Sequence, residues 1–353
     1  MMPGSTGTPY FSKTSRAWYS KRSTLAASSL RVGVVRGPPV SRHRDSSTSR
    51  DIGGINPSAT VGRLRARAFR MRGHPPSRAA AGPVQAGHGI RPGRGSYDRR
   101  VKPARDWTEY AADGGLVLGG AAAILLQLAD PVVARGVAAH SAFARDPLRR
   151  LEHTLAYVYA VSLGDDEVER LAARGVDRAH AGVPGAVDAE HQLWVAATLV
   201  WTGMRTHALL RGPLSPVVAE QVVARSERLA TALQLPAGVW PADRRAFDDY
   251  WDARLPTLEV GADARAVAAQ LLHATALPWW GRTAMPLVRI LTPALLPPAV
   301  REAYGLRVHR VRAAVLLAAL RTLLTLIPRR LRELPSRRLL AQLRRHTERE
   351  RTG

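Results

Sequence analysis

The sequence predicts an all-α domain over residues 106–353, preceded by a long basic segment. From Trp107 onward Ala, Leu and Val recur at spacings of three and four residues, which is the period of an amphipathic helix. Alternation of apolar and polar residues, the pattern typical of strands, is scarce over the same region. Prolines and N-cap residues punctuate the apolar pattern throughout, and they set the limits of the individual helices.

Helix starts and stops can be assigned from a few residue types. Asp130-Pro131 ends a first helix, because proline disfavours helix for the residue before it, and Pro131 can open a short second one. Asp165, Asp188 and Ser215 are suited to cap three later helices. The predicted helices cover residues 115–129, 147–162, 166–181, 189–210, 216–234, 241–254, 263–274, 298–304, 307–327 and 336–348.

Residues 1–105 form an Arg/Ser/Gly/Pro-rich segment with 21 basic and three acidic residues, a net charge of +18 out of +24 for the 353-residue chain. Such a composition buries too little apolar area to offset its ordering entropy, so we expect this segment to be disordered. We interpret it as a solvated tail or as sequence upstream of a later translation start, for example Met71. The alternatives are an organellar transit segment and an arm for nucleic acid or an anionic surface.

The basic residues of this chain are almost all arginine, with lysine at positions 13, 21 and 102. This bias resembles a genome-wide composition and argues against a nucleic-acid partner. The N-terminus lacks an apolar core followed by a small-residue cleavage site, so we expect no secretory signal. A cytoplasmic location is the expectation that follows.

Several chemistries are excluded by the residues that the chain lacks. With no cysteine, there is no disulfide framework, zinc ribbon, iron–sulfur cluster, thiolate-ligated haem or cysteine nucleophile. The sequence contains no HExxH, GxSxG, Walker or GxGxxG motif, and no repeated Glu-x-x-His pair of a di-iron bundle. A metal would therefore be held by His, Asp, Glu or Tyr, or through a haem.

Two helices carry candidate site residues. Arg150 and Thr154 lie four residues apart on the helix over 147–162, so they share a side, with His153 next to Thr154. They either flank the apolar stripe in solvent or form a polar pair that faces a cavity. His180 ends the helix over 166–181 on the face of Ala173, and it is either a core histidine bonded to a carbonyl or a metal or haem ligand.

Two apolar stretches raise the question of a membrane. Residues 114–133 have the length of a bilayer span, but Gln127 and Asp130 interrupt them, so we expect a buried core helix. Residues 307–327 combine arginines with an apolar face, and we expect this face to pack on the core, with an anionic membrane surface as the alternative. The face comprises Val308, Val311, Val315, Ala319, Leu323 and Leu326.

Four blocks over about 115–335 resemble the catalytic domain shared by rubber oxygenases (latex clearing proteins) and the endoplasmic-reticulum-bound oxygenase MpaB. They are GAAAILLQLADP at 120–131 with HSAF at 140–143, RLEHT at 150–154 followed by Gly164, HAGVPG at 180–185, and LWVAATL at 193–199. LPP at 296–298, Arg301 and YGL at 304–306 fit a later block of the family. Each block is weak alone, but their order and spacing together are fairly specific.

The resemblance implies an all-α, haem-dependent oxygenase. It implies that His180 is the proximal ligand of a haem b iron, and that Arg150 and Thr154 line the pocket. Two positions depart from the family pattern: His153 stands where the rubber oxygenases have a distal lysine, and Ala196 stands where the family has a histidine. We therefore expect Arg150, His153 and Thr154 to be the catalytic residues.

The implied reaction is oxidation or cleavage by dioxygen of a carbon–carbon double bond in an apolar, isoprenoid-type substrate. The alternative is a non-catalytic helical module that binds a lipid or a membrane surface through residues 307–327. Ala196 favours this alternative somewhat, and an absorption spectrum of the protein distinguishes the two.

Overall fold

The computed structural model describes residues 102–139, 147–181, 183, 186–273 and 277–352, without the side chains of 147–150 and 280. The chain divides into two units, residues 1–85 and 86–353, and the description concerns the second. Its elements are α3 (Trp107–Ala112), η1 (Gly114–Gly119), α4 (Gly120–Leu128), α5 (Pro131–Ala139), α7 (Pro147–Leu163), α8 (Asp166–His180), α9 (Ala189–Arg211), α10 (Pro216–Thr231), α11 (Arg244–Arg254), η2 (Leu255–Thr257), α12 (Ala262–His273), α13 (Trp279–Thr283), α14 (Met285–Leu295), α15 (Pro298–Ala303), α16 (Arg310–Leu326), α17 (Arg329–Arg332) and α18 (Leu334–Thr352).

Every regular element in these ranges is a helix and none is a strand, which confirms the predicted all-α class. Three helices begin directly after the predicted N-cap residues. The side chains of Asp165, Asp188 and Ser215 accept hydrogen bonds from backbone N–H groups in the first turns of α8, α9 and α10, at 3.0, 2.9 and 3.3 Å.

The helix predicted over 115–129 is instead two elements, the 3₁₀ turn η1 and helix α4. The break lies where η1 packs closely on α9, because a Cβ at Gly119 would collide with the Thr206 hydroxyl. Four further α-helices were not predicted. Helices α3, α13 and α17 are short, and α14 contains Pro286 and Pro293, residues that normally indicate a helix boundary.

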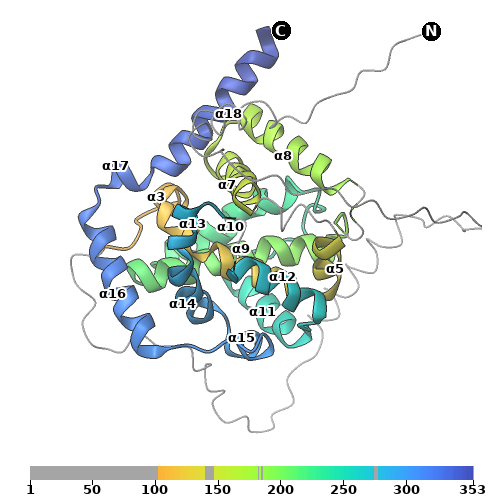
Figure 1. Cartoon of the computed structure of the whole chain (residues 1–353). Coiled ribbons are helices and arrows are strands. Elements are labelled where there is room, and N and C mark those ends of the chain that lie inside the picture. The colour runs from red at the N-terminus through yellow and green to blue at the C-terminus, as the bar shows by residue number, and fades with distance from the viewer. Residues whose placement is uncertain (1–101, 140–146, 182, 184–185, 274–276, 353) are drawn as a thin grey trace, which may run out of the picture. The chain divides into compact units, whose positions relative to one another are not determined.

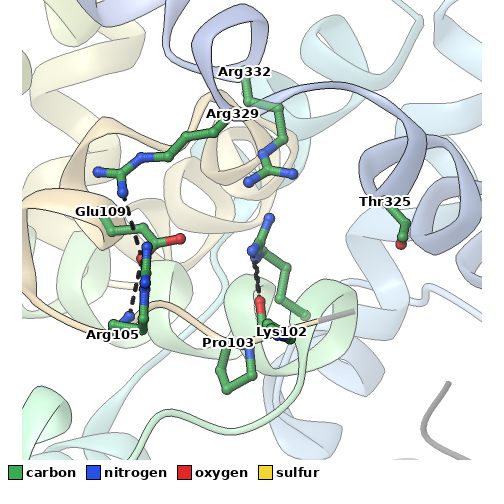
Figure 2. Close-up of a pocket in the computed structure, with 8 residues that line it drawn as sticks. Lys102, Pro103, Arg105, Glu109, Thr325, Arg329 and Arg332 are labelled. Atoms are coloured by element: carbon green, nitrogen blue, oxygen red, sulfur yellow. Dashed lines mark hydrogen bonds and ion pairs between the residues drawn. The ribbon is translucent and has the colours of Figure 1, made fainter. Parts of the chain in front are cut away.

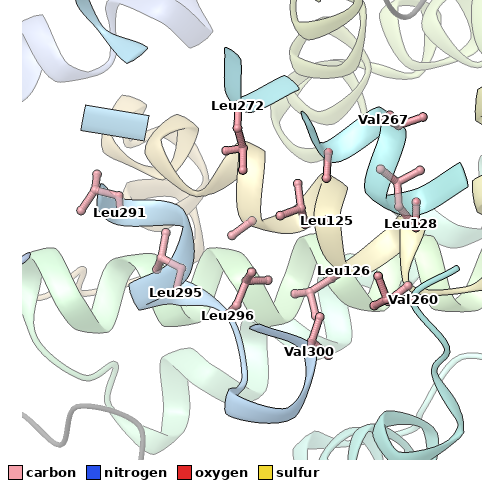
Figure 3. Packing of buried hydrophobic residues seen from close by; sticks show 14 of the residues in the cluster. Leu125, Leu126, Leu128, Val260, Val267, Leu272, Leu291, Leu295, Leu296 and Val300 are labelled. Atoms are coloured by element: carbon pink, nitrogen blue, oxygen red, sulfur yellow. The ribbon is translucent and has the colours of Figure 1, made fainter. Parts of the chain in front are cut away.

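Helix α9 is the central element of the domain, and α4, η1, α10 and α16 pack around it (Figure 1). One apolar cluster lies between α4, α9, α12, α14 and α15 (Figure 3). A second cluster surrounds Trp107, Trp240 and Phe247, and Trp201 of α9 contacts both. Large side chains that are fully buried in this way each stabilise the fold by about 1.5–3 kcal/mol. The two clusters hold α9 in place, including its first turns, which follow α8 in the chain.

Residues 114–133 do not form one long helix. The α4 side chains Leu125, Leu126 and Leu128 are buried, which confirms the expected core helix. No single helix in the described ranges has the length and hydropathy of a membrane span. The segment Gly114–Leu128, which is η1 with α4, reaches this length and hydropathy together with α5, but the chain bends by 107° between the segment and α5.

Helix α16 packs on the core through a different face from the predicted one. Ala313, Leu317 and Leu324 are buried, whereas Val311 and Leu326 are 77% and 74% exposed. The expectation that the face of Val311, Val315, Leu323 and Leu326 lies on the core is therefore wrong. Both sides of this helix are apolar enough to be a core face, so the hydrophobic pattern alone did not distinguish them.

The predicted disorder of residues 1–105 lies outside the described residues, apart from the last four. Those four residues belong to the folded domain. Ala104 is buried and its N–H donates to Nε2 of His207 at 3.1 Å, and the Lys102 carbonyl accepts from Arg211. The domain therefore includes residues 102–105 and does not begin at 106.

Candidate functional site

Helices α7 and α8 form a hairpin that gathers the predicted site residues at one end. They pack against each other and are joined by Gly164 and Asp165 alone. Because both helices rise equally per residue, position 150 near the start of α7 lies level with position 180 at the end of α8. Residues 150–154 and His180 are thus at the same open end of the hairpin, away from the turn.

His180 is half-buried in the last turn of α8. Val176, one turn earlier on the same side, packs against a cluster of Tyr157, Val161, Leu229 and Leu233 from α7 and the α10 region. After His180 the chain leaves the helix: the Ala181 N–H bonds to the Asp177 carbonyl, and the Val183 N–H bonds to the His180 carbonyl at 2.9 Å. The imidazole therefore lies at a helix end, one turn after Val176.

The α7 residues at this end have different exposures. His153 is half-buried, one turn before the buried Tyr157, and Thr154 is exposed. The side chain of Arg150 lies outside the described part of the structure. A cavity lined by Arg150 and Thr154 therefore stays a prediction.

Parts of the family-like blocks also fall outside the described residues. They are the HSAF block at 140–143 and residues 182, 184 and 185 of the block that follows His180. Each adjoins the open end of the hairpin in sequence. Ala196, the position of the family histidine, is buried in the apolar cluster of Trp107 and Val222. A methyl group is thus packed against apolar neighbours at that position.

A haem and a metal held by the protein alone require different sets of donor residues. Within the described ranges, no three His, Asp or Glu side chains gather into a group that could hold a metal ion. A haem iron requires one axial protein ligand on its proximal side, and a single histidine supplies it. His180, half-buried at the C-terminal end of α8, is the candidate for that ligand.

A charged cluster that the sequence interpretation did not foresee lies at the corner between α4 and α5. Asp130 is almost fully buried and accepts from the N–H groups of Val132 and Val133, so that it caps α5. Its Oδ2 also lies 2.9 Å from His191 Nδ1 and 2.5 Å from Arg254 Nη2. The partners are 61 and 124 residues away in sequence, so a search for pairs one helical turn apart misses them.

The ionisation of this cluster follows from its contacts. Burial alone would raise the pKa of Asp130, but the hydrogen bond and charge of His191 and the two backbone donors outweigh it, and the pKa is lowered. The Asp130 hydrogen bond raises the pKa of His191. The guanidinium of Arg254 lies 5.9 Å from the ring centre of Trp194, and Trp251 stacks on Trp194 and Trp201. The cluster joins the α4–α5 corner to α9 and α11.

His207, another core histidine of the sequence, has a structural role. Its Nε2 accepts from the Ala104 N–H and its Nδ1 donates to the Gly212 carbonyl at 3.0 Å, so both ring nitrogens are used. Burial, and then the charge of Arg211, lowers its pKa to about 4. A neutral imidazole with both nitrogens bonded is not available to a metal.

Comparison with models of protein families identifies the family of this chain. The family model described as "ER-bound oxygenase mpaB/B'/Rubber oxygenase, catalytic domain" matches residues 107–327, which spans α3 to α16. Two uncharacterized proteins, one of Mycobacterium bovis and one of Mycobacterium tuberculosis, are each 34% identical over 227 residues, covering 60% of this chain and 89% of each relative. No solved structure matches the chain significantly.

Proposed function

Because the chain belongs to the family of the ER-bound oxygenase MpaB and rubber oxygenase catalytic domains, we propose that it is a haem b-dependent oxygenase acting on an apolar, isoprenoid-type substrate. The observation that carries the proposal is the family match together with the place of His180. The match includes the whole α7–α8 hairpin, and His180 ends that hairpin as a half-buried residue.

Each residue at the open end of the hairpin has a proposed role. His180 holds the iron through one ring nitrogen, and a helix-end carbonyl is suited to orient the other. Arg150 binds a haem propionate, since a guanidinium pairs with a carboxylate in a bidentate manner. His153 and Thr154 would be hydrogen-bond donors toward the substrate. When bound, the haem supplies activation of dioxygen.

The support for an apolar substrate is the family match, because the matched description includes the rubber oxygenase catalytic domain. Cleavage of one carbon–carbon double bond by one dioxygen molecule gives two carbonyl groups and needs no further reductant. An alkene such as squalene satisfies this balance.

The test is dioxygen uptake by the haem-reconstituted protein with squalene, with the carbonyl products identified by mass spectrometry. We expect one dioxygen consumed for each cleaved double bond, and no uptake by His180→Ala. Uptake that persists in His180→Ala, or a haem-loaded protein that consumes no dioxygen with any alkene, contradicts the proposal. His273→Ala is the matched control, because His273 is exposed on α12 and bonds within its own helix.

A second proposed property, compatible with the first, is attachment of the cytoplasmic protein to an anionic membrane surface. Its support is the apolar stripe, defined as the exposed Val311, Val315, Leu323 and Leu326 of α16 with Leu331 of α17. Residues 303–332 contain no acidic residue, and the arginines exposed beside the stripe are Arg307, Arg310, Arg312, Arg329 and Arg330. An exposed apolar face with basic flanks is typical of helices that lie in the lipid interface.

Flotation with anionic vesicles tests the attachment. Val315→Glu with Leu326→Glu should abolish binding, because two carboxylates would enter the lipid interface. Val217→Glu is the matched control, since Val217 is as exposed as Val315 but belongs to α10. If the wild-type protein instead forms a dimer that these two substitutions dissociate, and no vesicle binds, the stripe is an interface between copies and the attachment is wrong.

A further inference from the structure

A cationic pocket adjoins the C-terminal end of the apolar stripe. It has a volume of about 380 Å³ and lies between α3, α16 and α17 (Figure 2). Five of its lining side chains are cationic and one is acidic: Lys102, Arg105, Arg211, Arg329 and Arg332 with Glu109, and Pro103 and Thr325 complete it. It is thus too polar for an apolar substrate and distinct from the open end of the α7–α8 hairpin.

The carboxylates around the pocket compensate only part of this charge. Glu109 pairs with Arg105 at 3.2 Å and with Arg329 at 3.8 Å. Asp113 pairs with Arg211 at 3.3 Å and with Arg332 at 4.0 Å. Glu333 pairs with Arg329 and also with Arg337, outside the pocket. Four of the five cations thus share three carboxylates, and the fifth, Lys102, has no ion pair among the residues that the structure describes.

Backbone carbonyls hold the two deepest arginines in place. Arg211 donates to the Lys102 carbonyl, and Arg332 donates to the carbonyls of Leu324 and Ile327 at 2.7 and 3.3 Å. Both side chains are about nine-tenths buried. The pKa of Arg211 is lowered, mainly by burial and further by the positive charge of Arg332, so the two guanidinium groups repel each other. A bound anion would reduce this repulsion without moving the side chains.

The pocket and the apolar stripe are interleaved along the chain. Thr325, Arg329 and Arg332 line the pocket, while Leu326 and Leu331 between them are exposed. An occupant that carries a negative charge next to a hydrocarbon chain would satisfy both surfaces together. A free anion would satisfy the pocket alone.

We propose that this cationic pocket binds the phosphate group of an anionic glycerophospholipid, with Leu326 and Leu331 in the lipid interface. The proposal rests on the attachment to a membrane surface argued above, and it adds a specific headgroup site to it. Phosphate suits the pocket because several guanidinium groups can share its oxygens.

Flotation of the full chain with vesicles of phosphatidylcholine, and of phosphatidylcholine with phosphatidylglycerol, tests the proposal. The variant Lys102→Gln/Arg105→Gln removes two cations at the pocket mouth, and Arg225→Gln/Arg245→Gln removes two exposed cations from α10 and α11. We expect the pocket variant to bind phosphatidylglycerol vesicles about thirtyfold more weakly, since each lost cation near the surface weakens binding about fivefold. The control variant should bind as the wild type does.

Three other outcomes overturn the proposal, and they do so in different ways. If the pocket variant and its control lose the same amount while Val315→Glu/Leu326→Glu abolishes binding, the attachment holds and the headgroup site is wrong. If no vesicle of either composition binds the wild type, the attachment itself is wrong. If glycerol 3-phosphate binds by calorimetry, and is lost in the pocket variant while vesicles do not bind, the pocket holds a soluble anion. Circular dichroism of each variant checks that it folds.

Discussion

Asp130 Oδ2 lies 2.9 Å from Nδ1 of His191, and this contact joins the α4–α5 corner to the first turn of α9. It also makes the stability of the fold depend on pH. The pKa of His191 is raised in the folded protein, so its contribution is complete below about pH 6.5, the pKa of an unfolded histidine, and is lost as the pH rises through the raised value. The pKa of Asp130 is lowered, so its contribution is present above about pH 3.9 and is lost as the pH falls through the lowered value.

The first prediction is that the free energy of unfolding falls as the pH rises from about 6 to about 9, by on the order of 1 kcal/mol for this pair. His191→Gln should remove that part of the fall, because a neutral amide does not titrate. Urea unfolding of both proteins at the two pH values measures it. An identical fall in His191→Gln contradicts the assignment, and His273→Gln on the surface of α12 is the control.

The second prediction concerns Asp130 itself. Asp130→Ala should destabilise the fold by about 3–5 kcal/mol, because it leaves two cationic partners without a carboxylate and removes the cap of α5. Asp252→Ala on the exposed face of α11 should change stability by less than about 0.5 kcal/mol. Thermal unfolding compares the two. Equal losses of stability in the two variants would show that the contacts of Asp130 do not stabilise the fold.

The third prediction tests the close approach of η1 to α9. Gly119→Ala should cost about 1–3 kcal/mol, since the new Cβ would collide with the Thr206 hydroxyl. Thr206→Ala in the same protein should recover part of the loss, because the colliding oxygen is then absent. Gly175→Ala on α8 has no atom within 4 Å of the new Cβ and should stabilise the fold by about 0.5–1 kcal/mol. Unfolding by urea separates the variants, and equal effects of Gly119→Ala and Gly175→Ala would refute the packing account.

The fourth prediction concerns the proposed pocket residues of α7. Arg150→Lys and Thr154→Val should each weaken haem retention, because a lysine loses the bidentate pairing and a valine loses the hydroxyl. Haem titration followed by absorbance measures both affinities. Arg225→Lys, an exposed residue of α10, should bind haem as the wild type does. Unchanged haem affinity in both α7 variants would show that Arg150 and Thr154 do not line the haem pocket.

Helix limits set by local chemistry could be predicted from the sequence. The starts of α8, α9 and α10 follow from Asp165, Asp188 and Ser215, because a cap depends on neighbours within the same turn. Helix α14 was missed because Pro286 and Pro293 both normally indicate a helix boundary. Pro286 falls in the first turn, where an N–H has no partner within the helix, whereas Pro293 lies inside it.

Features that depend on tertiary packing could not be predicted in the same way. The exposed face of α16 is decided by which side meets α9 and α14, and both sides are apolar. The contacts of Asp130 with His191 and Arg254 bridge 61 and 124 residues and have no local signal. For the candidate site, the hairpin that brings residues 150–154 level with His180 followed from the predicted helices and their short connection.

The visible absorption spectrum of the haem-reconstituted protein, before and after His180→Ala, tests the central claim most directly. The account predicts a strong Soret band in the wild type, loss of haem in His180→Ala, and retention of haem with an altered ligand-bound spectrum in His153→Ala. A wild-type protein that takes up no haem, or a His180→Ala variant with a full complement of haem and an unchanged spectrum, would contradict it.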